Sequence, residues 1–213
     1  DQDQLLDESL PITWRHINKL AGCGALGDLG SHLLSISQFI MGDITKVNAV
    51  ATTVFPKRPK SAGSTEMVDV ENEDIMTFMA EYANGAIGQI ACSRVATGRK
   101  NYLTYEIQGT KGSVRYDLER MGEVQVYFQS DNERDRGFRT VLLNPLMKGY
   151  SAFQPAGGIS IAYNDMKILE VHALFDAITN GADYVTDFEF GYKIDRTVAA
   201  VIESKTHEWV DVK

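Results

Sequence analysis

The sequence predicts an α+β fold in which a large, mainly antiparallel sheet is covered by helices on one face. Three observations support this prediction: strand-like segments joined by short turns, two helical segments near the C-terminus, and a glycine-rich helix start near the N-terminus. Strands joined by tight turns pair antiparallel, because a parallel neighbour needs a long crossover. Without an internal repeat or a linker, residues 1–213 are expected to form one domain with an open sheet face.

The elements expected in the N-terminal third follow from local composition. After a polar lead-in we expect a short strand over residues 10–17, and then a helix whose apolar residues recur from Leu29 until Gly42 ends it. Residues 44–55 are rich in Val, Thr and Ala, which predicts a long strand. Residues 56–67 combine Pro, Lys, Gly and Ser, which predicts a mobile loop.

The central part of the chain predicts a meander of paired strands. Asn84-Gly85 is the strongest two-residue hairpin signal, and short glycine-rich or charged turns separate two further pairs. The expected strands cover residues 75–82, 86–95, 102–108, 113–118, 124–129 and 138–143. Because Tyr, Phe, Met and Val alternate along these strands, we expect a second copy of the chain to cover the open sheet face.

Two helices and a closing strand are expected in the C-terminal third, over residues 164–179, 192–204 and 208–212. The first of these helices carries an apolar stripe and stops at Asn180-Gly181. The stripe consists of Ile168, Val171, Leu174, Phe175 and Ile178.

Composition limits the classes of function. The chain has 213 residues, 44% of them hydrophobic, and its net charge of −8 argues against nucleic-acid binding, which needs clustered Lys and Arg. Cys23 and Cys92 form neither a disulfide framework nor a zinc pattern, so we interpret them as thiols. No apolar run is long enough for a membrane span and no signal peptide is recognisable. We therefore expect a cytoplasmic protein that binds neither membranes nor nucleic acid.

One stretch, GCGALGDLGSHLL, carries the best candidates for catalysis. Asp28 and His32 are spaced i, i+4 in the predicted helix, which places both side chains on one face. An imidazole exchanges its proton near neutral pH and a carboxylate orients it, so the pair suits general acid–base catalysis. The structural alternative is that Asp28 caps the helix and His32 is a partly buried polar residue.

The same stretch matches the dinucleotide fingerprint G-x-G-x-x-G at Gly22, Gly24 and Gly27. We interpret the match as accidental, because Asp28 would stand beside a bound pyrophosphate and the following segments are not βαβ units. This chain is therefore expected to hold no cofactor-binding residue.

Three further residues are candidates for binding a substrate. Trp14 and Arg15 precede the glycine-rich turn, and Arg94 stands at the end of a predicted strand; a core Trp and solvated Arg side chains are the alternatives. No metal site is expected, because no two histidines share a helical face.

Several blocks, read in order, closely resemble the C-terminal domain of the Gfo/Idh/MocA oxidoreductase family, the relatives of glucose-fructose oxidoreductase and inositol dehydrogenase. The blocks are Trp14-Arg15, AGCGALGDLGSHLL, EYANGAIGQIACSR, EIQGTKGSVRYDLER, GFRTV, DAITNG, DFEFG and ESKTHEWVDV. The resemblance covers about residues 10–212. It implies a dihydrodipicolinate-reductase-like domain that binds substrate and forms homo-oligomers through its open sheet.

The resemblance also implies a function. The chain would belong to an NAD(P)-dependent dehydrogenase that transfers hydride between nicotinamide and a sugar or polyol hydroxyl, with Asp28 and His32 at the substrate. In the family, an N-terminal Rossmann domain holds NAD or NADP and supplies a catalytic lysine, so this chain alone is expected to be inactive and to bind no cofactor. The alternative is a non-catalytic binding or assembly module with the same fold. Which sugar, which nucleotide and which oligomer stay open.

Overall fold

The computed structural model describes residues 3–213, and the chain divides into two compact units. The first unit comprises Asp1–Arg99 and Thr186–Lys213, and the second comprises Lys100–Val185. The helical segments are η1 (Asp3–Leu6), η2 (Trp14–His16), α1 (Asn18–Ala21), η3 (Leu26–Gly30), α2 (Ser31–Met41), η4 (Leu118–Arg120), η5 (Glu133–Asp135), η6 (Tyr150–Ala152), α3 (Tyr163–Asn180), α4 (Phe188–Glu203) and η7 (Ser204–Thr206). The strands are β1 (Ile44–Thr52), β2 (Lys57–Pro59), β3 (Met67–Asp69), β4 (Ile75–Tyr82), β5 (Ile87–Ser93), β6 (Thr104–Gln108), β7 (Gly112–Asp117), β8 (Glu123–Phe128), β9 (Arg139–Leu142) and β10 (Val210–Asp211).

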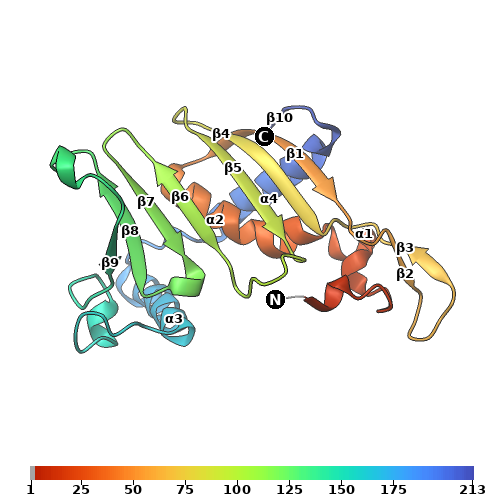
Figure 1. Cartoon of the computed structure of the whole chain (residues 1–213), viewed down its shortest axis with the longest axis horizontal. Helices are drawn as coiled ribbons and strands as arrows, with labels where there is room; N and C mark the ends of the chain where they lie inside the picture. The colour runs from red at the N-terminus through yellow and green to blue at the C-terminus, as the bar shows by residue number, and fades with distance from the viewer. Residues whose placement is uncertain (1–2) are drawn as a thin grey trace. The chain divides into compact units, whose positions relative to one another are not determined.

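All strand pairs described are antiparallel, and the predicted α+β class is confirmed. The first unit holds a four-stranded sheet in the order β10-β1-β4-β5 and a separate β2-β3 ribbon, and the second holds the meander β6-β7-β8-β9 (Figure 1). The strands are thus divided over two four-stranded sheets and a ribbon, where the sequence predicted one large sheet. Local turn signals fix which neighbours pair, but they do not say where one sheet ends.

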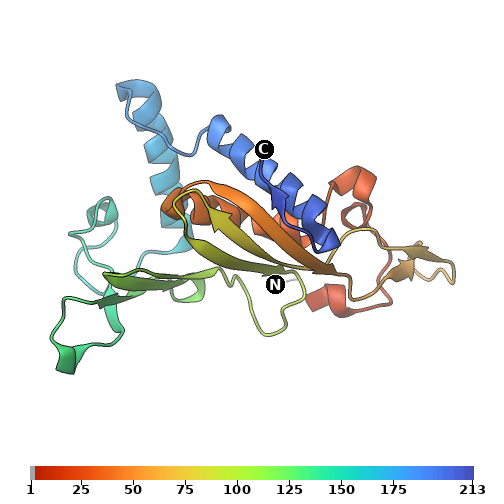
Figure 2. The same cartoon turned by 90° about the horizontal axis from the view of Figure 1, so that it is seen from above.

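Helices α2 and α4 lie side by side over one face of the sheet of the first unit (Figures 1 and 2). Buried side chains on this face include Phe78 and its cross-strand partner Ile90, and Val47 on β1. Leu34 of α2 and Val201 of α4 belong to the same buried cluster. Burial of this apolar area is the main source of stability for the unit.

One buried amide joins the helical layer to the sheet. The Gln38 side chain donates to the Thr197 hydroxyl at 3.1 Å and accepts from the Ile44 backbone amide at 3.2 Å. Gly42 ends α2 with a φ of 87°, a conformation that favours glycine, as the sequence predicted. Helix α2, whose first turn carries His32, is therefore anchored at its C-terminal end.

The uncovered face of the same sheet is mixed in character. Its exposed apolar side chains are Val50, Met79 and Ile87, the last 77% exposed. Phe78 and Tyr82, on β4 between the same strands, face the helices and are buried. This follows from the two-residue period of a strand, which sends neighbours to opposite faces.

The segment before the glycine-rich turn differs from its prediction. The strand expected over residues 10–17 is wrong: Trp14–His16 form a 3₁₀ turn. The Thr13 amide donates to His16 Nδ1 at 3.0 Å, and this local side-chain bond replaces a strand ladder bond.

Residues 56–67, which the sequence predicted to form a loop, contain the strand β2. Arg58, in β2, is 2% exposed, and its guanidinium donates to the carbonyls of Leu5, Asp7 and Leu10. An arginine between lysines has the composition of a loop, but here it organises the N-terminal segment.

The second unit contains the predicted amphipathic helix, α3, ended by Gly181 in the left-handed conformation. None of its side chains is buried, and the five residues of the predicted stripe are exposed. No helix in the part of the chain that the structure describes combines the length and apolar character needed to cross a bilayer.

Candidate functional site

A cavity of about 200 Å³ in the first unit brings together four of the five predicted site residues. Its lining consists of Trp14, Arg15, Ala21, Cys23, Gly24, Gly27, Asp28 and Arg94. His32 does not line the cavity; it lies one turn beyond Asp28 and is exposed. Segments near residues 14, 24 and 94 thus converge, as a substrate site requires.

The helix that carries Asp28 and His32 begins irregularly. Residues Leu26–Gly30 form a π-helical turn that leads into α2 at Ser31. Such turns are rare and occur often at functional sites. Both Asp28 and His32 are exposed, so each can meet a ligand from outside.

The wall before the glycine-rich turn is built from Trp14 and Arg15. Trp14 is 53% exposed rather than a core residue, and the Arg15 guanidinium carbon lies 4.4 Å from the centre of its ring. This cation–π contact stiffens the pair and leaves indole surface at the cavity. The Asn72 side-chain Nδ2 donates to the Arg15 carbonyl at 2.8 Å, which fixes the backbone of the wall.

Arg94 differs from a solvated arginine because its side chain is 1% exposed. Its Nε donates to Asp74 Oδ1 at 3.0 Å, and its backbone amide donates to the Asp74 carbonyl at 3.0 Å. Within the described residues its Nη2 is buried without a hydrogen-bond partner. Arg94 lines the cavity, and its guanidinium therefore has one donor that no described residue uses.

The glycine-rich turn is held by Glu73, a residue that sequence reasoning missed. The buried Glu73 carboxylate accepts from the amides of Gly24 and Leu26, each at 3.0 Å, and the Ala25 amide donates to the Glu73 carbonyl at 3.0 Å. A Cβ on Gly24 would lie 1.9 Å from that carbonyl oxygen, so the close approach requires glycine. A dinucleotide phosphate would have to displace a buried carboxylate from these amides.

His16, the residue after Arg15, is buried and does not line the cavity. Burial lowers its pKa, and the positive charges of Arg94 and Arg58 lower it further. Because Nδ1 accepts from the Thr13 amide, the ring proton resides on Nε2, which has no partner within the described residues. His16 is thus a neutral structural histidine.

Both cysteines remain thiols at neutral pH. Burial raises the pKa of Cys23, which lines the cavity, and raises that of Cys92 to about 12; the Glu73 carboxylate adds to both shifts. No group of three or more His, Cys, Asp or Glu side chains in residues 3–213 is arranged to hold a metal ion. The cavity therefore offers hydrogen bonds and an indole face to a ligand.

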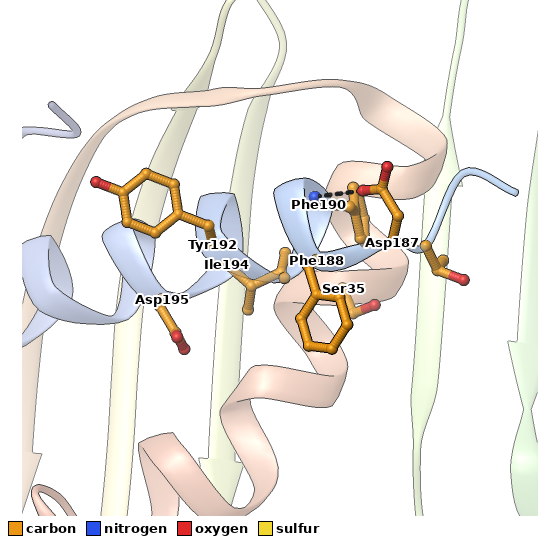
Figure 3. Close-up of a pocket in the computed structure, with 9 residues that line it drawn as sticks. Ser35, Asp187, Phe188, Phe190, Tyr192, Ile194 and Asp195 are labelled. Atoms are coloured by element: carbon orange, nitrogen blue, oxygen red, sulfur yellow. Dashed lines mark hydrogen bonds between the residues drawn. The ribbon is translucent and has the colours of Figure 1, made fainter.

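A second, more open hollow of about 450 Å³ lies at the start of α4 (Figure 3). Phe188 and Tyr192 line it together with Ser35 of α2, and the Asp187 carboxylate is used to cap α4 by accepting from the Phe190 amide at 2.9 Å. None of the predicted site residues lines this hollow, so the smaller cavity is the better candidate.

Comparison with known proteins places these features in a wider group. The family model described as "GFO/IDH/MocA C-terminal domain" matches residues 2–115. Levoglucosan dehydrogenase of Pseudarthrobacter phenanthrenivorans is 38% identical over an alignment 225 residues long. The alignment covers 99% of this chain and 57% of that protein.

Solved structures give the same picture. One of levoglucosan dehydrogenase in complex with NADH and levoglucosan superposes with a TM-score of 0.90 at 38% identity, over 99% of this chain and 56% of that one. The structure of an NAD binding oxidoreductase from Klebsiella pneumoniae gives a TM-score of 0.92 at 38% identity, over 100% of this chain and 57% of that one. The chain spans a little more than half the length of these relatives.

Proposed function

Because this chain belongs to the GFO/IDH/MocA oxidoreductase family, we propose that residues 1–213 act as the substrate-binding and oligomerisation domain of an NAD-dependent sugar dehydrogenase. The single observation that carries the proposal is the cavity where Trp14, Arg15, Asp28 and Arg94 meet. The relative whose structure holds levoglucosan and NADH covers this chain along nearly its whole length.

The cavity suits a sugar. The exposed indole of Trp14 offers an apolar face to the C–H surface of a pyranose ring, while Arg15 and Arg94 offer donors to hydroxyl oxygens. Asp28 accepts from a hydroxyl. A volume of about 200 Å³ matches one small ring better than an extended chain.

The chemistry that we assign to this chain is removal of the hydroxyl proton. NAD, when bound, supplies the acceptor for the hydride that leaves the same carbon. His32 lies one helical turn from Asp28, and a sugar that fills the cavity and extends along α2 brings a hydroxyl to its imidazole. Asp28 orients the imidazole and the substrate together.

The glycine-rich turn of this chain does not fit a dinucleotide, because Glu73 already occupies its amides. The nucleotide is then held outside these residues. Calorimetric titration of the chain with NAD and with NADP should show no binding. Micromolar affinity for either would contradict this part of the proposal.

The open sheet face is our candidate for self-association. Val50, Met79 and Ile87 are exposed there, and burying them against a second copy removes apolar area from water. Sedimentation at micromolar concentration should give a dimer or larger species, and Ile87→Asp should shift it toward monomer. Arg115→Asp, on the other unit, is the charge-change control and should leave the distribution unchanged.

The deciding experiment uses the longer protein that contains this chain. Purified protein is incubated with NAD and a panel of anhydrosugars, sugars and polyols that begins with levoglucosan, and NADH formation is followed by absorbance. Turnover of one of these compounds supports the dehydrogenase. Sugar binding without turnover, or a gene without a nucleotide-binding half, points to the alternative, a non-catalytic binding module.

A further inference from the structure

We infer that three consecutive buried residues, Asn72, Glu73 and Asp74, are positioning residues that each hold a different wall of the cavity. They lie between β3 and β4, and each is at most 5% exposed. The inference rests on the proposed function only in naming a sugar as the occupant.

Asp74 holds the wall formed by Arg94. Its two carboxylate oxygens are both engaged: Oδ1 accepts from Arg94 Nε at 3.0 Å and Oδ2 from the Val54 amide at 2.8 Å. The carboxylate thus ties the Nε edge of the guanidinium to the end of β1. Nη2 is left without a partner among residues 3–213, and an oxygen of a cavity ligand would satisfy it.

Glu73 and Asn72 hold the other two walls. Glu73 binds the amides of Gly24 and Leu26 where the helix of Asp28 begins, a place where the helix dipole favours a carboxylate. Asn72 donates to the Arg15 carbonyl at 2.8 Å and accepts from the Asn18 side chain at 3.2 Å. The spacing between the three walls is therefore set by one short segment of backbone.

Stability alone is a poor explanation for the Asp74–Arg94 pair. Both side chains are nearly fully buried, and removing two charges from water costs about as much as their attraction returns. In proteins, replacing such a pair by apolar residues of the same volume often leaves stability unchanged or raises it. A buried guanidinium with a spare donor beside a cavity is explained if that donor meets a ligand.

The test is a comparison of Asp74→Asn with Asp69→Asn in the longer protein. Asp69 is the control because it forms an exposed ion pair with Lys57 at 3.4 Å, away from the cavity. Asp74→Asn should raise KM for the sugar about tenfold or more, with a smaller change in kcat and KM for NAD within about twofold. Asp69→Asn should change none of these values.

A double-mutant cycle separates positioning from general loss of structure. If Asp74 acts through Arg94, then Arg94→Gln raises the sugar KM by itself, and adding Asp74→Asn raises it no further. Additive effects, or an unchanged sugar KM in Asp74→Asn, would overturn the inference. Should the single Asp74→Asn variant not fold, the Asp74→Asn/Arg94→Gln double variant, which has no unpaired buried charge, is compared with Arg94→Gln alone.

A second measurement is independent of turnover. By nuclear magnetic resonance, the Arg94 Nε–H of the wild-type chain should be protected from solvent exchange, and its resonance should shift when the sugar is added. Asp74→Asn should abolish this protection, whereas Asp69→Asn should leave it unchanged. If the wild-type protein oxidises no sugar, the proposed function fails while this resonance still reports on the positioning. An unprotected Nε–H in the wild type would contradict the positioning role.

Discussion

The exposed face of the site and the buried segment behind it use the same residue types for opposite purposes. The exposed face consists of Trp14, Arg15, Asp28 and His32, and the buried segment of Asn72, Glu73 and Asp74. Asp28 is exposed and lines a cavity, whereas both carboxylate oxygens of Asp74 are bonded inside the protein. The exposed carboxylate that lines the cavity and the buried carboxylates that fix its surroundings lie in different parts of the sequence.

This difference predicts a separation of effects. Changes on the exposed face should lower activity and leave the free energy of unfolding nearly unchanged, because surface substitutions cost little stability. Changes in the buried segment should lower stability as well, because they leave buried groups unpaired. Variants of single residues test whether activity and stability separate in this way.

The largest effect is expected for His32→Ala in the longer protein. Loss of a general base should lower kcat by about 10² to 10⁴, while the melting temperature stays within a few degrees. Asp28→Asn should lower kcat less, because Asn keeps a side-chain oxygen that accepts a hydrogen bond from a hydroxyl. His172→Ala, an exposed histidine on α3, is the control. Wild-type turnover by His32→Ala would remove His32 from the reaction.

Gly24→Ala should show the opposite behaviour. Its Cβ would lie 1.9 Å from the Glu73 carbonyl oxygen, so the turn or the segment before β4 must move, at a cost of about 3 kcal/mol in unfolding free energy. Gly137→Ala places its Cβ in open space and should change stability by less than about 1 kcal/mol. Urea unfolding of both variants measures the difference. Equal stability would mean that Glu73 does not hold the turn tightly.

The smallest effect concerns His16. Its pKa is lowered in the folded chain, so the unfolded chain binds the extra proton first as the pH falls, and stability should decline from about pH 7 toward pH 5. One proton allows a slope of at most about 1.4 kcal/mol per pH unit. His16→Asn keeps an acceptor for the Thr13 amide and should flatten that slope, whereas His172→Asn should not. An unchanged slope in His16→Asn would assign the pH dependence to other groups.

Much of the fold was predictable because its signals are local. The hairpin at Asn84-Gly85 and the stop at Gly42 depend on turn geometry that neighbouring residues specify, and β4 was predicted residue for residue. The strand predicted over residues 10–17 was wrong because His16 bonds back to Thr13, an interaction that hydrophobic alternation does not reveal.

The site was predictable only in part. Asp28 and His32 are marked by their spacing, Trp14 and Arg15 by their place before the glycine-rich turn, and Arg94 by its place at a strand end. The cavity unites all of these but His32. Glu73 and Asp74 were missed because their partners are 20 to 49 residues away in the sequence. The only local signal was a run of four polar residues, 71–74, directly before an apolar strand.

The central claim is that a sugar occupies the cavity lined by Trp14, Arg15, Asp28 and Arg94. The most direct measurement is a crystal structure of the longer protein with NADH and the sugar that it oxidises. The account predicts a sugar ring against the Trp14 indole, an oxygen within hydrogen-bond distance of Arg94 Nη2, and the reacting hydroxyl within about 3 Å of the His32 imidazole. A sugar bound elsewhere, such as in the hollow beside Phe188 and Tyr192, with this cavity holding only water, would contradict it.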